Sequence, residues 1–215
     1  MPGLYWLWQH SFPNSSEHWQ RHYERGGNSG PGSYGDFAEY KAHHINSAIA
    51  EHGISSIIEF GCGDGNQLSY LDIEKYIGLD VSKTAIGICL ERYAGDPTKS
   101  FMWYDPQYFQ DPLHVVGADC AMSLDVVYHL KEDAVFARYL RDLFSCGRRF
   151  VIIYGMDRDQ NNREHASVFY RKYSDYIARN IRDFRLMKHV PAQGKFGDFF
   201  VYERDAEAGR GRDAQ

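Results

Sequence analysis

The sequence predicts an α/β fold in which a doubly wound, mainly parallel sheet ends in an antiparallel C-terminal hairpin strand. Three observations predict it. In the middle of the 215-residue chain, short apolar runs alternate with helical stretches at the spacing of βαβ units. These runs are near-continuous, which is typical of strands that are covered on both faces of a parallel sheet. After Asn180, two strand-like runs follow each other with only a short turn between them, which predicts a hairpin.

The predicted elements are as follows. A helix is expected over residues 36–52, because apolar residues recur on one side and Gly53 stands at the position of a C-terminal glycine. Two more apolar stripes predict helices over residues 83–93, which Ser82 caps, and over residues 132–145. Apolar runs predict the parallel strands over residues 56–60, 74–79, 100–104, 118–124 and 149–154. The hairpin strands are expected at one edge of the sheet, over residues 184–190 and 196–203.

We expect three parts along the chain. Residues 1–53 hold N-terminal helices and a glycine-rich segment, residues 54–204 form the α/β domain, and residues 205–215 form a flexible tail. The glycine-rich segment, residues 26–35, contains five glycines in ten positions. Such a segment is either a lid that closes over a ligand or a plain flexible linker.

The composition excludes several classes of protein. With 43% hydrophobic and 25% charged residues, the chain is globular rather than disordered. The formal net charge of −5 argues against a nucleic-acid partner. No apolar run reaches the roughly 18 residues of a membrane span, and the N-terminus lacks the basic start of a signal peptide. The four cysteines are widely separated, which predicts free thiols, no metal site and a cytoplasmic protein.

A glycine-rich turn follows the first predicted strand. Gly61, Gly63 and Gly65 allow a ligand to approach the backbone closely, at the edge where open α/β sheets bind ligands. Asp80 ends the second predicted strand, at the spacing of about 20 residues where a carboxylate binds the hydroxyls of a ribose. The pattern therefore predicts a cofactor that contains a nucleoside.

Two residues around the turn distinguish the kind of nucleoside. Asn66 stands at the sixth position, where a dinucleotide-binding turn has its third glycine. Glu59, two residues before the first glycine, adds a carboxylate that disfavours a pyrophosphate and suits a cationic ligand. The turn thus favours a positively charged cofactor without phosphate over a nicotinamide dinucleotide.

The middle of the chain resembles the class I S-adenosylmethionine-dependent methyltransferases, whose domain is Rossmann-like. Residues 59–65 resemble the first motif of that family, Asp80 its ribose-binding acid, and residues 101–105 and 119–125 its third and fourth motifs. Residues 23–35 resemble the N-terminal lid of a bacterial subgroup often found with polysaccharide and small-molecule tailoring genes. The resemblance implies S-adenosylmethionine as the cofactor. The cofactor contacts predicted from the turn and the resemblance are Tyr23, Gly30, Glu59, Gly61, Gly63, Gly65, Asp80, Val81, Asp105, Ser123 and Leu124.

Acceptor chemistry is expected from the segment that follows the fourth strand. Asp125 and His129 are four residues apart and share one face if this turn is helical. A histidine with a near-neutral pKa is a suitable general base for a hydroxyl or an amine, and Asp125 is a candidate to orient its ring. His165, after the fifth strand, is an alternative base.

These features predict S-adenosylmethionine-dependent methyl transfer to a small polar acceptor, such as a hydroxyl or amine of a sugar, a sugar-linked intermediate or a similar metabolite. Two alternatives stay open. One is a nicotinamide-dependent oxidoreductase or epimerase on the same fold, against which Asn66 and the lack of a Tyr-x-x-x-Lys pair after the fourth strand argue. The other is a catalytically silent, cofactor-binding partner subunit. The acceptor atom and the oligomeric state, including a homo-oligomer, stay open.

Overall fold

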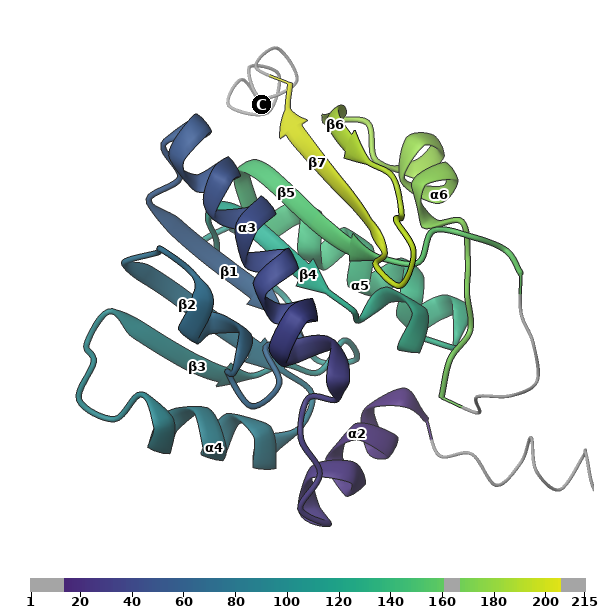
Figure 1. The fold of residues 1–215 in the computed structure, drawn as a ribbon. Helices are drawn as coiled ribbons and strands as arrows, with labels where there is room; N and C mark the ends of the chain where they lie inside the picture. Colours follow the sequence, from purple (N-terminus) through teal and green to yellow (C-terminus); the bar gives the residue numbers. More distant parts are fainter. Residues whose placement is uncertain (1–13, 161–166, 206–215) are drawn as a thin grey trace, which may run out of the picture.

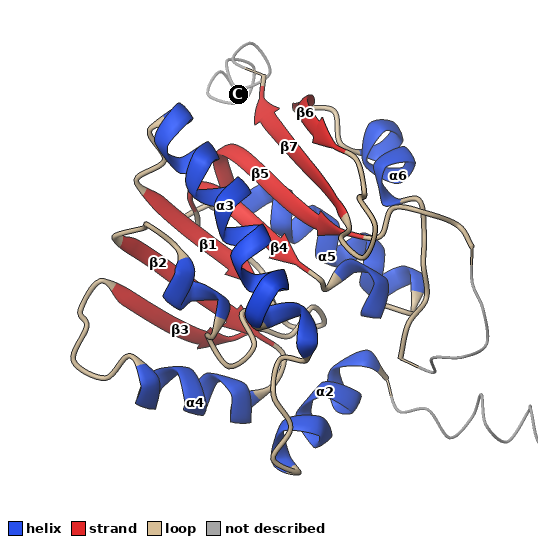
Figure 2. Ribbon diagram, in the orientation of Figure 1, coloured by secondary structure: helices blue, strands red, loops and turns tan. Residues whose placement is uncertain are grey.

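The computed structural model describes residues 14–160 and 167–205, which form a seven-stranded sheet with the order β3-β2-β1-β4-β5-β7-β6 (Figures 1 and 2). The strands β1 to β5 pair in parallel, and β7 is antiparallel to both β5 and β6. The predicted doubly wound, mainly parallel sheet with its antiparallel hairpin is therefore confirmed. The strands are β1 (Ser56–Phe60), β2 (Lys75–Asp80), β3 (Lys99–Trp103), β4 (Ala118–Leu124), β5 (Gly147–Gly155), β6 (Phe184–Val190) and β7 (Asp198–Arg204).

The boundaries of β2 and β3 are shifted by one residue from the predicted ones, and those of β5 and β7 differ by two residues at the start. β5 begins at Gly147, two residues before the predicted start, because its first residue still pairs with Ala118 ahead of an irregularity in the β4 register. β7 begins at Asp198 because Gln193 and Phe196 form an isolated bridge that closes the preceding turn. Both differences concern local pairing at the strand ends and leave the topology unchanged.

Helices cover both faces of the sheet, with α3 in front of it and α5 behind it in Figure 1. Consecutive strand residues point to opposite faces, so Ile57 lies in the core on the α3 side and Ile58 in the core on the α5 side. Residues of α4 pack in the core on the α3 side, and residues of α6 pack in the core on the α5 side. These helices are α3 (Gly35–His52), α4 (Lys83–Arg92), α5 (Asp133–Cys146) and α6 (Tyr173–Asn180).

A further helix, α2 (Ser15–Glu24), lies beside the carboxyl ends of the parallel strands (Figure 1). The side chain of Asn14 caps it by accepting a hydrogen bond from the backbone N–H of Glu17 at 2.8 Å. Ser15 ties it to the residue before α5, because its N–H and Oγ both donate to the Glu132 carboxylate. The sequence placed helices in residues 1–53 but located only α3, since α2 buries just two residues and has no apolar stripe.

α6 was also not predicted, because its eight residues carry too short a pattern. No helix among the described residues is long and apolar enough to cross a membrane. All but the first residue of the predicted C-terminal tail lies outside the described residues.

Candidate active site

A cavity of about 550 Å³ opens at the carboxyl ends of the parallel strands, next to α2 and the 3-10 helix η1 (Pro31–Ser33). This volume lies within the range of small-molecule and cofactor sites. The strand order separates the ends of β1, β2 and β3 from those of β4, β5 and β7, so the cavity has two halves. The cofactor half is lined by Tyr23, Ser29, Gly30, Gly61, Gly63, Asp80, Val81, Tyr104 and Pro106, and the acceptor half by Trp19, Asp125, Tyr128, His129, Tyr154, Met156, Tyr170 and Lys195.

The glycine turn forms the floor of the cofactor half. The N–H groups of Gly61 and Cys62 both donate to the carbonyl oxygen of Leu79, which fastens the turn to the end of β2. Gly61 and Gly63 adopt left-handed backbone conformations, with φ of +83° and +57°. A Cβ on Gly63 would lie 2.1 Å from Oγ of Ser29, and one on Gly61 would lie 2.4 Å from Val126. Glycine is therefore required here for both conformation and space.

Asp80, the predicted ribose-binding acid, is buried and lines the cofactor half. Its Oδ2 accepts a hydrogen bond from the N–H of Gly63 at 2.9 Å, and its Oδ1 accepts one from the N–H of Ser82 at 2.8 Å. Burial raises the pKa of Asp80 to about 6, although these two hydrogen bonds favour the ionised form. Since each oxygen keeps a free lone pair, the carboxylate is able to accept two ligand hydroxyl groups.

Two predicted cofactor contacts lie away from the cavity. Glu59 points to the α3 side of β1, where its Oε2 accepts a hydrogen bond from the Tyr76 hydroxyl at 2.5 Å. Burial raises the pKa of Glu59 to about 7, so this carboxyl takes up a proton near neutral pH more readily than an exposed one, and it is packed behind the turn. Gly65 lies where the turn leaves the cavity, and its carbonyl accepts a hydrogen bond from the Tyr93 hydroxyl at 2.8 Å. Both residues shape the turn, and neither is among the residues that line the cavity.

Asp105 and Ser123 also act indirectly. Oδ1 of Asp105 accepts a hydrogen bond from the N–H of Gln107 at 2.8 Å, so the side chain caps a turn, and the residues on either side of Asp105 line the cavity instead. Ser123 is fully buried, with its Oγ 2.7 Å from the hydroxyl of Tyr139, which itself lines the cavity. Leu124, the last residue of β4, does line it, as predicted.

The glycine-rich segment is tied to the glycine turn by hydrogen bonds. The N–H of Ser29 and the hydroxyl of Tyr34 donate to Oδ2 of Asp64 at 3.0 and 2.7 Å, and the N–H of Asp64 donates to Oγ of Ser29 at 2.8 Å. The Tyr23 hydroxyl lies 2.9 Å from the same Oγ. Together with Gly30, which lines the cavity, these residues cover the cofactor half. The arrangement supports the lid interpretation over that of a plain linker.

His129 ends the 3-10 helix η3 (Val127–His129) and lines the acceptor half. Its Nδ1 lies 2.8 Å from the carbonyl oxygen of Ser167, and because a carbonyl only accepts, Nδ1 carries the proton. Nε2 is therefore the free basic atom of the neutral ring. Burial lowers the pKa of His129, although the Ser167 contact and the charge of Asp125 oppose the shift. The ring is held edge-on against Trp19, with 4.9 Å between the ring centroids. His129 is thus a neutral, oriented base.

The predicted pairing of Asp125 with His129 is wrong. Oδ2 of Asp125 accepts a hydrogen bond from Nζ of Lys41 at 2.8 Å, and Oδ1 accepts one from the Tyr128 hydroxyl at 2.9 Å. The backbone carbonyl of Ser167 supplies the orientation of His129 that was assigned to Asp125. The second predicted base, His165, lies outside the described residues.

The sequence reasoning missed Lys41, which lies behind the acceptor half and pairs with Asp125. Lys41 is fully buried on α3, on the same stripe as Ala38, Ala42 and Ile45. A lysine in the middle of an apolar stripe was therefore the available signal.

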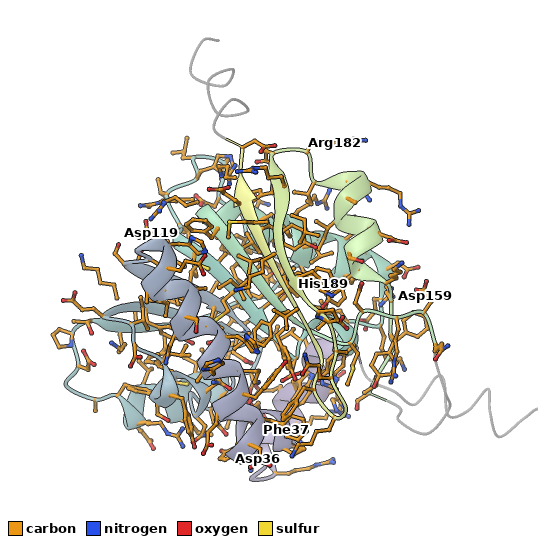
Figure 3. All side chains as sticks on the ribbon, turned by 45° about the horizontal axis from the view of Figure 1, so that its top comes forward. Asp36, Phe37, Asp119, Asp159, Arg182 and His189 are labelled. Atoms are coloured by element: carbon orange, nitrogen blue, oxygen red, sulfur yellow. The ribbon has the colours of Figure 1, made fainter. Side chains whose placement is uncertain are left out.

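The electrostatics of the cavity fit a phosphate-free cationic nucleoside. Among the described residues that line it, Lys195 is the one lysine or arginine, and its Nζ pairs with Asp36, which Figure 3 labels beside Phe37 at the start of α3. The glycine turn leads into the short 3-10 helix η2 (Gln67–Tyr70), so it lacks the α-helix N-terminus that binds phosphate in dinucleotide folds. The buried carboxylate of Asp80 and the close backbone of Gly63 fit a ribose and an amino-acid tail.

Comparisons with known proteins agree with this geometry. Residues 58–152 match a family model described as a methyltransferase domain. A curated mRNA cap guanine-N(7) methyltransferase 1 of Oryza sativa subsp. japonica is 30% identical over 117 residues, which cover 53% of this chain and 28% of that protein. The chain thus spans about a quarter of the length of the curated relative that it matches.

Two solved structures share the fold at low sequence identity. The N-methyltransferase NodS from Bradyrhizobium japonicum WM9, in complex with S-adenosyl-L-homocysteine, is 17% identical with a TM-score of 0.69, over 89% of this chain and 99% of NodS. The magnesium protoporphyrin IX methyltransferase ChlM from Synechocystis PCC 6803, with bound S-adenosylmethionine, is 14% identical with a TM-score of 0.62, over 91% of this chain and 99% of ChlM. Residues 58–152 therefore match a methyltransferase domain, and the sheet shares the fold of these two methyltransferases.

Proposed function

We propose that the protein transfers a methyl group from S-adenosylmethionine to a small polar acceptor, such as a hydroxyl or amine of a sugar or a similar metabolite. The observation that carries the proposal is the single cavity that joins the Asp80 carboxylate to the His129 imidazole. A ribose-binding acid at one end and a free base at the other are the two groups that such a transfer needs from the protein.

In the cofactor half, Asp80 would accept hydrogen bonds from the ribose hydroxyls, and Gly61 and Gly63 would bring the backbone against the amino-acid tail. Bound S-adenosylmethionine supplies an electrophilic methyl group on a sulfonium. Tyr104 and Pro106, at the end of β3, offer an aromatic and apolar wall for the adenine. The lid over this half would exclude water from the reacting centre.

In the acceptor half, His129 would remove the proton from the attacking hydroxyl or amine. Its Nε2 is unprotonated because Nδ1 is committed to the Ser167 carbonyl, and its lowered pKa keeps the ring neutral near pH 7. Methyl transfer itself requires alignment more than covalent catalysis, which the closely packed rings of Trp19, Tyr128 and Tyr170 support.

The structure favours this function over the alternatives. A nicotinamide dinucleotide would need a helix N-terminus for its pyrophosphate, and the turn leads into the 3-10 helix η2 instead. A silent partner subunit would have no use for a base oriented as His129 is. The name of the rice relative suggests a nucleic-acid acceptor, but the net charge of −5 and the paired state of Lys195 support a small molecule. The four cysteines are free and buried, which supports a cytoplasmic location.

Isothermal titration calorimetry with S-adenosylhomocysteine and with NADH tests the cofactor. We expect binding of S-adenosylhomocysteine and none of NADH. Incubation with S-adenosylmethionine and candidate sugars, amino sugars and capped RNA then tests the reaction through the release of S-adenosylhomocysteine. Tight binding of NADH, or turnover with the RNA alone, would contradict the proposal.

A further inference from the structure

Lys41 is a buried cation whose partner faces the cavity. Its side chain is 1% exposed, and its Nζ lies 2.8 Å from Oδ2 of Asp125, whose side chain is 22% exposed and lines the acceptor half. Taking a lysine out of water is costly unless it is paired, so the protein must retain the carboxylate to keep Lys41 inside. The carboxylate of Asp125 therefore faces the cavity, and the ammonium group of Lys41 lies behind this carboxylate, away from the cavity.

The backbone of Asp125 is held in an unusual conformation. Its φ of +59° lies in the left-handed region, which few non-glycine residues adopt, although aspartate and asparagine do so more readily than most. Its N–H donates to the carbonyl oxygen of Tyr154 at 2.9 Å, and the Tyr128 hydroxyl donates to Oδ1. Three contacts from three separate elements thus fix where the carboxylate points.

The carboxylate keeps acceptor capacity toward the cavity. A carboxylate accepts about four hydrogen bonds, and Lys41 and Tyr128 use two of them. Around it stand the aromatic rings of Tyr128, Tyr154 and Tyr170. Nζ of Lys41 already lies over the Tyr154 ring, 5.4 Å from its centroid, and the guanidinium of Arg158 lies 4.4 Å from that of Tyr170. Of the described residues that line this half, Lys195 alone carries a fixed positive charge, and it is paired with Asp36. An ammonium group would therefore find a carboxylate acceptor in the wall of this half, whereas Arg158, a cation outside the lining, lies against Tyr170.

We infer that the acceptor half is an amine site, in which Asp125 binds the ammonium group of the acceptor and Lys41 is the positioning residue that holds Asp125. This inference rests on the proposed methyl transfer and narrows its acceptor from a hydroxyl or amine to an amine. It also gives Asp125 a role that is independent of the orientation of His129.

Methyl transfer to the amine uses His129 as the proton acceptor and Asp125 as the hydrogen-bond acceptor. The ammonium group first gives one proton to Nε2 of His129, which frees the nitrogen lone pair. That pair forms the new N–C bond to the methyl carbon, while the C–S bond breaks and its electron pair stays on sulfur. Asp125 accepts hydrogen bonds from the remaining N–H groups throughout and does not exchange a proton.

The test uses the full chain loaded with S-adenosylhomocysteine and three probes on one ring skeleton: D-glucosamine, D-glucose and D-glucuronate. NMR titration measures the dissociation constant of each probe. We expect glucosamine to bind about tenfold more tightly than glucose, since hydrogen bonds to charged groups are the stronger ones, and glucuronate to bind most weakly. Equal binding of the three probes, or binding of none, overturns the inference.

Substitutions identify the residues that cause the preference for glucosamine over glucose. Asp125→Asn should abolish it and leave the affinity for S-adenosylhomocysteine unchanged, and asparagine tolerates the left-handed backbone. Lys41→Met should weaken the preference and Lys41→Arg should restore it, whereas Lys172→Met, which removes an exposed ion pair with Asp175, should have no effect. If Lys41→Met does not fold, Asp125→Asn decides, and a preference that survives in Asp125→Asn overturns the inference. If the wild-type protein did not bind S-adenosylhomocysteine at all, that result would instead contradict the proposed function.

Discussion

The two halves of the cavity are built in different ways. The cofactor half is formed by backbone and by residues that follow directly after strands, such as Gly61, Gly63 and Asp80. The acceptor half is formed by side chains from elements far apart in the chain, among them Trp19 of α2, His129 of η3 and Tyr154 of β5. The cofactor half can therefore be recognised from a sequence motif, whereas the acceptor half depends on how the helices pack on the sheet.

This difference has a functional meaning. A cofactor that many proteins share needs one constant geometry, which the glycine turn and the strand ends supply. An acceptor that differs between proteins needs a wall that is able to change without disturbing the sheet, and loops and added helices supply it. Substitutions in the two halves should therefore affect different measurements, in the following order of size.

The largest effect is expected from His129→Ala, which removes the base of the acceptor half. Turnover should fall about 10²- to 10⁴-fold, while the affinity for S-adenosylhomocysteine stays unchanged. The wild-type rate should rise with pH through a midpoint below the ordinary histidine value of about 6.5, because burial lowers the pKa of His129. This limb should be absent in the variant and present in His43→Ala, a control at an exposed histidine of α3. If the rate of His129→Ala still rose with pH through the same midpoint, another residue would have to be the base.

Gly63→Ala should damage the cofactor half instead. A left-handed backbone costs a non-glycine residue roughly 1–2 kcal/mol, and the added Cβ would meet Oγ of Ser29 at 2.1 Å. We expect about a 100-fold loss of affinity for S-adenosylhomocysteine in calorimetry. Gly87→Ala is the matched control, since its Cβ meets nothing within 4 Å on α4 and alanine favours a helix by roughly 0.5–1 kcal/mol. Wild-type affinity in Gly63→Ala would show that the turn does not contact the cofactor.

Asp80→Ala should weaken S-adenosylhomocysteine binding by roughly 1.5–3 kcal/mol, or about 10- to 150-fold, because the ribose hydroxyls lose a charged acceptor. In the wild-type protein the affinity should also fall as the pH drops below about 6, where the buried Asp80 takes up a proton. The stability of the cofactor-free protein depends on pH in the opposite direction. Because the pKa of Asp80 is raised in the folded state, Asp80 favours folding at low pH, and this contribution is lost as the pH rises through about 6. Calorimetry between pH 5 and 8 that shows no change of affinity would contradict the role of Asp80.

The smallest effect is expected from Asp64→Asn, which weakens the attachment of the lid to the turn. Burial opposes ionisation of Asp64, but the hydrogen bonds from Tyr34 and Ser29 prevail and lower its pKa, so the lid binds the charged form. We expect a loss of affinity for S-adenosylhomocysteine of only a few fold, since lid and turn keep their other contacts. Hydrogen exchange across residues 26–35 should be slowed by S-adenosylhomocysteine in the wild type and less so in the variant. Equal exchange with and without the ligand would make the segment a linker.

Local patterns were sufficient for most of the sheet. The five parallel strands and the hairpin were predicted from apolar runs. The runs of β1, β4 and β5 are mostly buried on both faces, as predicted, whereas β3 and β6, at the two edges of the sheet, are mostly exposed. Local patterns were also sufficient for Gly61, Gly63 and Asp80, whose roles depend on the turn between two adjacent strands. α2 could not be located, because its residues are polar and its position is determined by contacts such as that of Ser15 with Glu132.

The sequence by itself determined the order of the strands along the chain, the helices α3, α4 and α5, the glycine turn and the acid that ends β2. These depend on spacings of a few residues and on backbone conformations that particular residue types require. Only the tertiary structure decided that Glu59 turns away from the cavity, that Asp125 binds Lys41, and that His129 is oriented by the carbonyl of Ser167. The partners of Asp125 and His129 are 84 and 38 residues away in the chain, and a contact over such a separation exists only once the helices and loops have packed on the sheet.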